Sequence, residues 1–347
     1  MSEALQPVSW PQLTSRLLHG EDLSAADTAA AMTAIMQGEA GPVQIAGFLI
    51  ALRAKGETSS EIAGLVRTMR HFALAVPLDF PTVDTCGTGG DRSGTFNIST
   101  VAAVVAAAAG ARVAKHGNRA ASGLCGSADL LEAWGVAISL PPDAVAQCIR
   151  EVGIGFCFAQ AYHPAMRHAM PARRELGVPT AFNVLGPLTN PAGAQYQTIG
   201  VSDPVLAERM ATVLAELGSE HALVFHGEDG LDELTTTGPS HVWEVRDGNV
   251  DYYGLDPADF GIARAARADL LGGDVDTSRA IADGVLDGKP GAPRDVVALS
   301  AGAALYVADR AASLSDGLDA AYAVIDAGAA RSTLQRWVAL SQQLAAA

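Results

Sequence analysis

One stretch decides the fold of this chain: Asp84-Thr85-Cys86-Gly87-Thr88-Gly89-Gly90-Asp91. It begins within a β-favourable run over 82–85 and is followed by Asn97-Ile98-Ser99-Thr100, the expected start of a helix. Glycines let backbone N–H groups approach phosphate oxygens, and a helix N-terminus favours negative charge. The stretch therefore indicates an anion-binding loop between a strand and a helix. A plain tight turn stays open as the alternative, because glycine commonly marks turns.

This glycine pattern differs from the two best-known phosphate-binding fingerprints. Arg92 stands where a dinucleotide-binding GxGxxG would need glycine, and no Gly-Lys-Ser/Thr follows as in a P-loop. The chain also lacks a GxSxG elbow, an HExxH motif and a Cys/His set with zinc-site spacing. We therefore expect neither serine hydrolysis nor zinc catalysis.

Outward from this stretch, short β-favourable runs alternate with helical ones, the pattern typical of a parallel sheet with crossover helices. Asp247-Gly248 is a good hairpin turn between two further runs. We predict strands at 82–85, 112–115, 154–158, 198–201, 222–225, 242–245 and 250–253, helices at 98–109, 128–134, 142–152 and 204–217, and a helical tail from Asp276.

The first seventy residues show helical patterns without strands. Ser9 with Gln12 and Ser24 with Asp27 have capping-box spacing, and Ser59 or Ser60 is expected to cap a helix that runs to Phe72. The sequence thus predicts an α/β protein with a small N-terminal helical domain and a larger α/β domain, whose mostly parallel central sheet has helices around it.

Composition excludes several classes of protein. Of the 347 residues, 49% are hydrophobic, which indicates a globular chain, and 23 Lys plus Arg against 38 Asp plus Glu leave a net charge of −15. This balance disfavours nucleic acid and anionic membranes as partners. The four cysteines show no CxxC spacing and are expected to be reduced thiols. Without a signal peptide or an apolar run near ~20 residues, we expect a cytoplasmic protein.

Three polar clusters could carry chemistry. Lys115-His116-Gly117-Asn118-Arg119, with Ser122, follows a predicted strand and could bind a polyanion; a solvated surface turn is the alternative. The segment 227–233 holds four carboxylates, of which adjacent Asp232 and Glu233 suit Mg²⁺; it could also be an acidic surface loop. Arg173, in a helical stretch restarted by Pro171, could bind a carboxylate or form a salt bridge with Glu175.

Together these motifs resemble the anthranilate phosphoribosyltransferases, which share the nucleoside phosphorylase-like glycosyltransferase fold. The resemblance covers essentially the whole chain and rests on four strings in the family's order: 84–91 with 97–100, 115–119 leading to 126–129, 173–177 running to 183–191, and 226–233. It implies transfer of phosphoribose from phosphoribosyl pyrophosphate to anthranilate, Mg²⁺ as cofactor with two ions per subunit, and a cytoplasmic homodimer. The implied helical domain, for dimerisation and the acceptor, is 1–74 with about 163–190; the α/β domain, for the donor and metal, is 75–162 and 191–347.

The resemblance also implies roles for particular residues. Lys115, Asn118 and Arg173 would be catalytic. Anthranilate would be held by Gly87, Asn118 and Arg173, with Arg173 facing its carboxylate, and the metal by Ser99, Asp232 and Glu233. Phosphoribosyl pyrophosphate would be held by Gly87, Gly90, Asp91, Thr95, Asn97, Ile98, Ser99, Thr100, Lys115, His116, Gly117, Asn118, Arg119, Ala120, Ala121, Ser122, Gly123 and Ser127.

The chain departs from the family where a Ser-rich loop is common, because it reads Ala120-Ala121-Ser122-Gly123-Leu124-Cys125. Backbone amides could still bind phosphate there, although Gly123 offers no hydroxyl. Two other functions remain as alternatives: a pyrimidine nucleoside phosphorylase, and a non-catalytic relative that uses the same cleft to bind nucleic acid or sense a metabolite.

Overall fold

The computed structural model describes residues 8–120 and 124–347. The chain divides into two compact units, one formed by 1–74 with 160–189 and the other by 75–159 with 190–347. Within the described ranges, no helix is both long enough and apolar enough to cross a bilayer.

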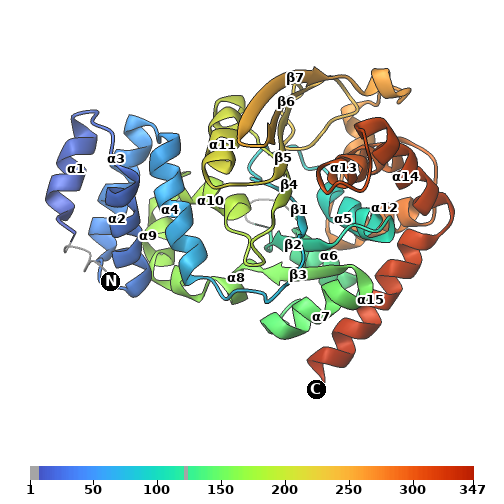
Figure 1. Ribbon diagram of the computed structural model, residues 1–347, viewed down its shortest axis with the longest axis horizontal. Helices are drawn as coiled ribbons and strands as arrows, with labels where there is room; N and C mark the ends of the chain where they lie inside the picture. The colour runs from blue at the N-terminus through green and yellow to red at the C-terminus, as the bar shows by residue number, and fades with distance from the viewer. Residues whose placement is uncertain (1–7, 121–123) are drawn as a thin grey trace. The chain divides into compact units, whose positions relative to one another are not determined.

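The smaller unit is helical (Figure 1). Its elements are α1 (Trp10–Leu18), α2 (Ala25–Gln37), α3 (Pro42–Lys55), α4 (Ser59–Phe72), the 3₁₀ turn η1 (Pro164–His168), α9 (Met170–Leu176) and α10 (Phe182–Leu188), with the short α8 (Ala159–Tyr162) at the crossing between units. The apolar faces of these helices make its core, which contains Ile35, Phe48, Leu52 and Ile62. Pro171 lies in the first turn of α9, so the expected restart of the helix at this proline is confirmed.

Some of the helix caps predicted for this unit are present and others are not. The capping box of Ser24 and Asp27 is confirmed. Ser9 precedes α1 but its side chain makes no capping hydrogen bond, so the expected box with Gln12 is wrong. The cap of α4 is also corrected: Thr58, not Ser59 or Ser60, accepts a hydrogen bond from the N–H of Glu61, and the Glu61 carboxylate accepts from the N–H of Thr58.

The larger unit contains a sheet that forms seven strands within the described residues, in the order β3-β2-β1-β4-β5-β6-β7. The first five are parallel, and β6 and β7 form the antiparallel hairpin expected at Asp247-Gly248. The bounds are β1 (Val83–Gly87), β2 (Val113–Gly117), β3 (Ile154–Phe158), β4 (Tyr196–Gly200), β5 (His221–Gly227), β6 (Ser240–Arg246) and β7 (Asn249–Leu255). The predicted mostly parallel sheet is confirmed.

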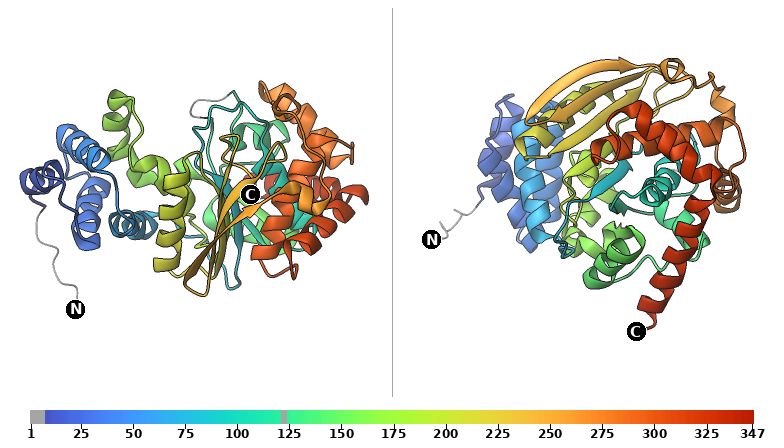
Figure 2. Two further views of the ribbon diagram at one scale, coloured as in Figure 1. Left: turned by 90° about the horizontal axis from the view of Figure 1, so that it is seen from above. Right: turned by 45° about the vertical axis from the view of Figure 1, so that its right-hand side comes forward.

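Helices cover both faces of this sheet. The apolar α5 and α13 lie with α14 on one face, and α11 lies on the other against β5 and β6 (Figures 1 and 2). These layers bury the central strands on both sides, as parallel sheets require. The bounds are α5 (Ile98–Ala108), α6 (Ser127–Ala133), α7 (Pro142–Val152), α11 (Pro204–Glu216), α12 (Val275–Leu286), α13 (Ala292–Val307), α14 (Leu314–Asp326) and α15 (Ala329–Ala345), with 3₁₀ turns η2 (Pro257–Phe260) and η3 (Arg267–Leu270). The four cysteines are free thiols.

The strand order reverses direction between β1 and β4. From β1 the chain adds β2 and then β3 on one side of the sheet, and it then adds β4 and β5 on the other side of β1. In open α/β sheets, ligands bind beyond the carboxyl ends of the strands at such a switch point. The topology therefore predicts a ligand site beside Gly87 and Gly200, the last residues of β1 and β4, which are paired in register.

Candidate active site at the carboxyl ends of β1 and β4

The glycine loop after β1 presents backbone amides to an acidic residue. Gly89 and Gly90 have φ of 67° and 85°, a left-handed backbone that side-chain-bearing residues rarely adopt. The N–H of Thr88 donates to the carbonyl of Gly200 at 2.9 Å, and the N–H of Gly89 donates to Asp232 Oδ2 at 2.6 Å. The loop is thus more than a tight turn, because one of its amides already binds an anionic group of the protein itself.

Asp232 fits over the switch point only because two glycines make room for it. A Cβ atom on Gly87 would lie 2.5 Å from Asp232 Oδ2, and one on Gly200 would overlap the carbonyl oxygen of Asp232. Since Gly87 and Gly200 are register partners, the neighbouring strands together form the seat of this carboxylate. Gly200 was not among the predicted site residues; its place at the end of a strand that precedes a loop was the available signal.

Glu233 lies against the N-terminus of α5. Its Oε1 accepts a hydrogen bond from the N–H of Ser99 at 3.2 Å, where the helix dipole favours negative charge. Asn97 precedes the helix, but its side-chain amide donates to the carbonyl of Cys125 at 3.0 Å and makes no capping bond. The predicted helix start at 97–100 thus lies beside the predicted metal carboxylates, and Asn97 ties it to the segment that leads into α6.

The carboxyl groups here are held close together with little solvation. Loss of solvation raises the pKa of Asp232, and the neighbouring Asp91 raises it further. For Glu233, loss of solvation and the charge of Asp232 raise the pKa to about 8, although Lys115 opposes the shift. The buried Oδ2 of Asp91 has no hydrogen-bond partner among the described residues. Such a cluster favours protons or a cation.

These residues fit a magnesium ion that substrate phosphates help to hold. Oxygen donors are what Mg²⁺ prefers, and proteins usually bind it through one or two carboxylates plus phosphate. Residues 8–120 and 124–347 contain no group of three or more His, Cys, Asp or Glu arranged to hold a metal ion. The carboxyl pair and the orphaned Asp91 oxygen can supply the protein's share.

The acidic loop 227–233 divides its carboxylates between two tasks. Asp229 Oδ2 accepts hydrogen bonds from the hydroxyls of Thr235 at 2.7 Å and Thr237 at 2.5 Å, and its Oδ1 accepts from the N–H of Leu231 at 3.2 Å. These bonds shape the loop that presents Asp232. The alternative of an acidic surface loop is therefore wrong for Asp229, Asp232 and Glu233, which are engaged in internal bonds, and holds for Glu228, which is exposed.

The end of β2 supplies a buried cation. Lys115 is 2% exposed, and its Nζ donates to the carbonyl of Thr85 at 2.5 Å. Burial lowers the pKa of Lys115, while the charges of Asp84, Cys86 and Glu233 act in the opposite direction. The expectation of a surface turn is thus wrong for Lys115 and for His116, which is also buried.

Asp84 and Asn190 hold this strand end in place and were not predicted as site residues. The fully buried Asp84 accepts hydrogen bonds from the N–H of His116 at 3.0 Å and from Asn190 Nδ2 at 2.7 Å. Asn190 Nδ2 also donates to the carbonyl of Ala114 at 2.7 Å. Asp84 opens the stretch 84–91 and Asn190 lies near the end of the string 183–191, so both residues stand in motifs visible in the sequence. The sequence did not predict that these two side chains contact each other.

Beyond β2 the chain is exposed. The backbone carbonyl of Asn118 accepts a hydrogen bond from Ser127 Oγ at 3.0 Å, which brings these two predicted residues together. Arg119 Nη1 lies 2.8 Å from Asp129 and 2.5 Å from Glu132, so its guanidinium already has two carboxylate partners. Ala120 N donates to Asp129 as well. The predicted residues Ala121, Ser122 and Gly123 lie outside the described residues.

The remaining residues that were predicted to bind phosphoribosyl pyrophosphate follow the glycine loop in the chain. Thr95 forms an isolated β-bridge with Leu271, close to Gly94 and Phe96, whose backbones also bond to this segment. The side chains of Ile98 and Thr100 point into the core, being 0% and 1% exposed. Any contact that these two make with a ligand therefore comes from their backbone.

Arg173 belongs to α9 of the helical unit. Its guanidinium carbon lies 5.0 Å from the centre of the Phe182 ring, and burial lowers the pKa of the side chain. Across the described ranges Arg173 forms no ion pair, so the expected alternative of a salt bridge with Glu175 is wrong. A partly buried guanidinium held on an aromatic ring without a carboxylate is a ready partner for an anionic ligand.

Comparisons with known proteins agree along the whole chain. Residues 11–73 match the helical bundle domain of the glycosyl transferase family, and residues 79–331 match its a/b domain. The anthranilate phosphoribosyltransferase of Roseiflexus sp. (strain RS-1) is 54% identical over 329 residues, 94% of this chain and 96% of that protein. The solved enzyme of that name from Thermus thermophilus is 46% identical, with a TM-score of 0.90 over 95% of this chain and 99% of its own. The Saccharomyces cerevisiae enzyme in complex with PRPP and Mg is 25% identical, with a TM-score of 0.89 over 98% and 100%.

Proposed function

We propose a division of labour within the site on the premise that this chain belongs to the anthranilate phosphoribosyltransferase family. The chain is a Mg-dependent glycosyltransferase that moves the phosphoribosyl group from 5-phosphoribosyl 1-pyrophosphate to the amine of anthranilate, giving N-(5-phosphoribosyl)anthranilate and pyrophosphate in tryptophan biosynthesis. The pyrimidine nucleoside phosphorylase and the non-catalytic relative are not favoured by these matches. One observation carries the proposal: the carboxyl pair Asp232-Glu233 lies directly on the glycine loop and the α5 N-terminus.

The donor site is proposed in the larger unit. Amides of the glycine loop and of the α5 N-terminus bind the phosphate oxygens, because both present N–H groups and positive dipole ends. Lys115 adds a fixed positive charge beneath the loop. The proposed donor-binding residues are Gly87, Gly90, Asp91, Thr95, 97–100, 115–123 and Ser127.

Ser99, Asp232 and Glu233 are proposed to hold Mg²⁺, with two ions per subunit. When bound, Mg²⁺ neutralises charge on the pyrophosphate leaving group. The chain's own part is to aim two carboxyl groups at the metal beside the phosphate-binding amides, and because the pKa values of both groups are raised, metal binding there is coupled to proton release. Most of the acceleration then comes from positioning the two substrates, since an arylamine is neutral at pH 7 and needs orientation more than a strong base.

The acceptor is proposed to meet Arg173 through its carboxylate, with Gly87 and Asn118 completing its site. Support comes from the Arg173 guanidinium, which rests on Phe182 and has no carboxylate partner among the described residues. A planar guanidinium binds a carboxylate through two parallel hydrogen bonds, each strengthened by charge. This explains why an arginine, and not an apolar pocket alone, would select a benzoate.

The experiment follows anthranilate fluorescence, which the reaction removes. We expect its loss to require both phosphoribosyl pyrophosphate and Mg²⁺. Asp232→Asn combined with Glu233→Gln should abolish turnover, whereas Asp251→Asn on the exposed strand β7 should not change it. Unchanged fluorescence together with phosphorolysis of thymidine or uridine would contradict the proposal.

The acceptor assignment has its own test. Arg173→Ala should raise the anthranilate KM by roughly 10–100-fold, the worth of a charge-assisted hydrogen bond, while calorimetry shows phosphoribosyl pyrophosphate binding unchanged. Arg174→Ala is the matched control, because Arg174 is an exposed neighbour on the same helix. Equal loss of both substrates in Arg173→Ala would refute this division of the site.

A homodimer formed through the helical unit, located in the cytoplasm, completes the proposal. Leu18 and Val43 are 72% and 85% exposed on the adjacent helices α1 and α3, an unusual exposure for apolar side chains that suits a protein interface. Light scattering should give twice the chain mass for the native protein and the chain mass for Val43→Asp. The four free thiols are consistent with a reducing compartment.

A further inference from the structure

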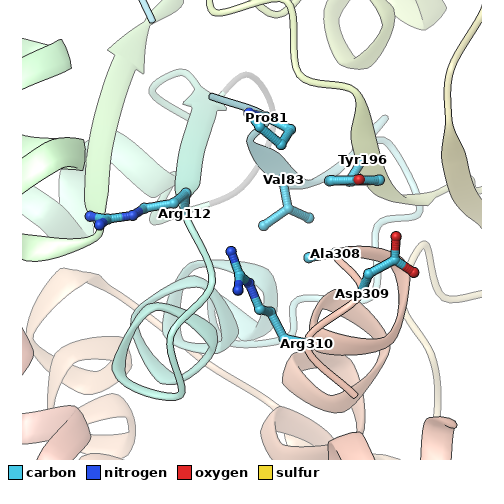
Figure 3. Close-up of a pocket in the computed structure, with 7 residues that line it drawn as sticks. All are labelled: Pro81, Val83, Arg112, Tyr196, Ala308, Asp309 and Arg310. Carbon is cyan, nitrogen blue, oxygen red and sulfur yellow. The ribbon is translucent and has the colours of Figure 1, made fainter. Parts of the chain in front are cut away.

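A hollow of about 200 Å³ lies at the opposite end of the sheet from the candidate active site (Figure 3). Val83 and Tyr196 form its wall as the first residues and register partners of β1 and β4, whose last residues seat Asp232. Pro81 lies just before β1, and the other side is formed by Asp309 and Arg310, which follow α13. All of these residues belong to the larger unit.

Arg310 and Arg112 line this hollow differently. The guanidinium of Arg310 points toward the space between Val83 and Ala308, whereas that of Arg112 points away (Figure 3). Arg112 is engaged elsewhere, because it donates to the carbonyls of Ile149 and Arg150 at 2.8 and 2.7 Å. Among residues 8–120 and 124–347, the Arg310 side chain has no hydrogen bond or ion pair. It is the cation of the hollow that is available to a ligand.

The opposite charge lies next to it in the chain. Asp309 adopts φ of 52°, an uncommon left-handed backbone for a residue with a side chain, and its carboxylate points toward Tyr196 (Figure 3). Its ion pair with Arg246, at 3.9 Å, is long and exposed, so the carboxylate keeps the capacity to accept from a ligand. The hollow thus combines one guanidinium, one carboxylate that also bonds to the Tyr196 hydroxyl, and the apolar side chains of Pro81 and Val83.

We propose that this hollow binds a zwitterionic α-amino acid with an apolar side chain. Arg310 receives the ligand carboxylate, Asp309 receives its ammonium group, and Pro81, Val83 and Tyr196 contact the side chain. A phosphate or other dianion fits poorly, because Asp309 repels it. The volume suits a side chain up to the size of a phenyl ring, since a cavity of about 150 Å³ accepts benzene.

Calorimetry with four compounds and the full chain tests the proposal. We expect L-leucine and L-phenylalanine to bind, and phenylalaninamide and N-acetyl-phenylalanine, each lacking one charge, to bind at least 10-fold more weakly. Inorganic phosphate should not bind here. Absence of binding by both amino acids at 10 mM (roughly the limit of a useful small-ligand affinity), or equal binding of all four compounds, would overturn the proposal.

Two variants locate the site. Arg310→Gln should weaken L-phenylalanine binding at least 10-fold and Asp309→Asn by a similar factor, while Arg267→Gln, the same change at another exposed arginine, should leave it unaltered. Transferase activity of Arg310→Gln should equal that of the native chain, which shows that it is folded and separates this test from that of the proposed function. Undiminished binding by Arg310→Gln would refute the assignment.

Discussion

Gly200 offers a direct test of how the sheet seats the loop that carries Asp232, the proposed metal ligand. In Gly200→Ala the new methyl group would overlap the carbonyl of Asp232 and lie 3.1 Å from the N–H nitrogen of Glu233. Both neighbours are backbone atoms, so no side-chain rotation relieves the contact. The loop has to move by about 1–2 Å before ordinary van der Waals distances return.

This displacement should affect activity more than folding. Overpacking of this kind costs about 1–3 kcal/mol of stability, or several degrees in Tm. A misplacement near 1 Å at a reacting centre costs about 100-fold in rate. We therefore expect Gly200→Ala to remain folded, to lose about 100-fold in kcat/KM for phosphoribosyl pyrophosphate, and to need more Mg²⁺ for half-maximal activity.

The assay combines Mg²⁺ titrations of anthranilate consumption with thermal unfolding followed by circular dichroism. Gly254→Ala is the control, because Gly254 lies in β7 of the same sheet and its added methyl would meet no atom within 4 Å. If Gly200→Ala keeps activity within about threefold of Gly254→Ala, an effect below 1 kcal/mol, then the strand ends do not position the loop and the reasoning fails.

Three further predictions concern stability. The pKa of Glu233 is raised to about 8 in the folded state, so the native chain binds more protons than the unfolded chain at pH values just below 8. Without Mg²⁺, the free energy of unfolding relative to that of Glu233→Gln should therefore fall by a few kcal/mol as the pH rises from 5 to 9. Scanning calorimetry measures this difference. An unchanged difference would contradict the shift. Thr58→Ala should lower the free energy of unfolding in urea by about 1 kcal/mol, and Ser9→Ala should leave it unchanged, because of these two side chains only that of Thr58 caps its helix. Equal losses in the two variants would contradict these cap assignments. Asn190→Ala should cost about 2–4 kcal/mol by the same measurement, since it removes the amide that donates to Asp84 Oδ2 and to the Ala114 carbonyl; a cost below 1 kcal/mol would mean that water replaces the amide.

Local patterns in the sequence predict the elements of the fold well. The strand starting at Ile154 and the helix starting at Ile98 begin where expected, because alternation and helix-start signals are encoded by neighbouring residues. The cap of α4 was misplaced by a residue or two, since Thr58, Ser59 and Ser60 are all good caps and only the position of Glu61 decides among them.

The site was predictable as a set of residues but not as a geometry. Asp232 could be named because two adjacent carboxylates after a strand suit magnesium, yet its contact with Gly200 depends on strand register, which local sequence does not fix. Lys115 was expected at the end of a strand, but its burial was not predicted, because its partners Thr85 and Asp84 come from the neighbouring strand. Long-range pairing decides both cases.

The chain leaves the α/β unit after the edge strand β3 and re-enters it before β4, which lies beside the strand-order switch. The excursion 160–189 carries Arg173 and ends at Asn190, which is fastened to the centre of the sheet. The return end of the excursion is therefore tied to the sheet, while its helices pack against α2, α3 and α4. A change of specificity that replaces this segment has to preserve both sets of contacts, so substitutions at single positions such as Arg173 disturb the fold less than exchange of the whole segment.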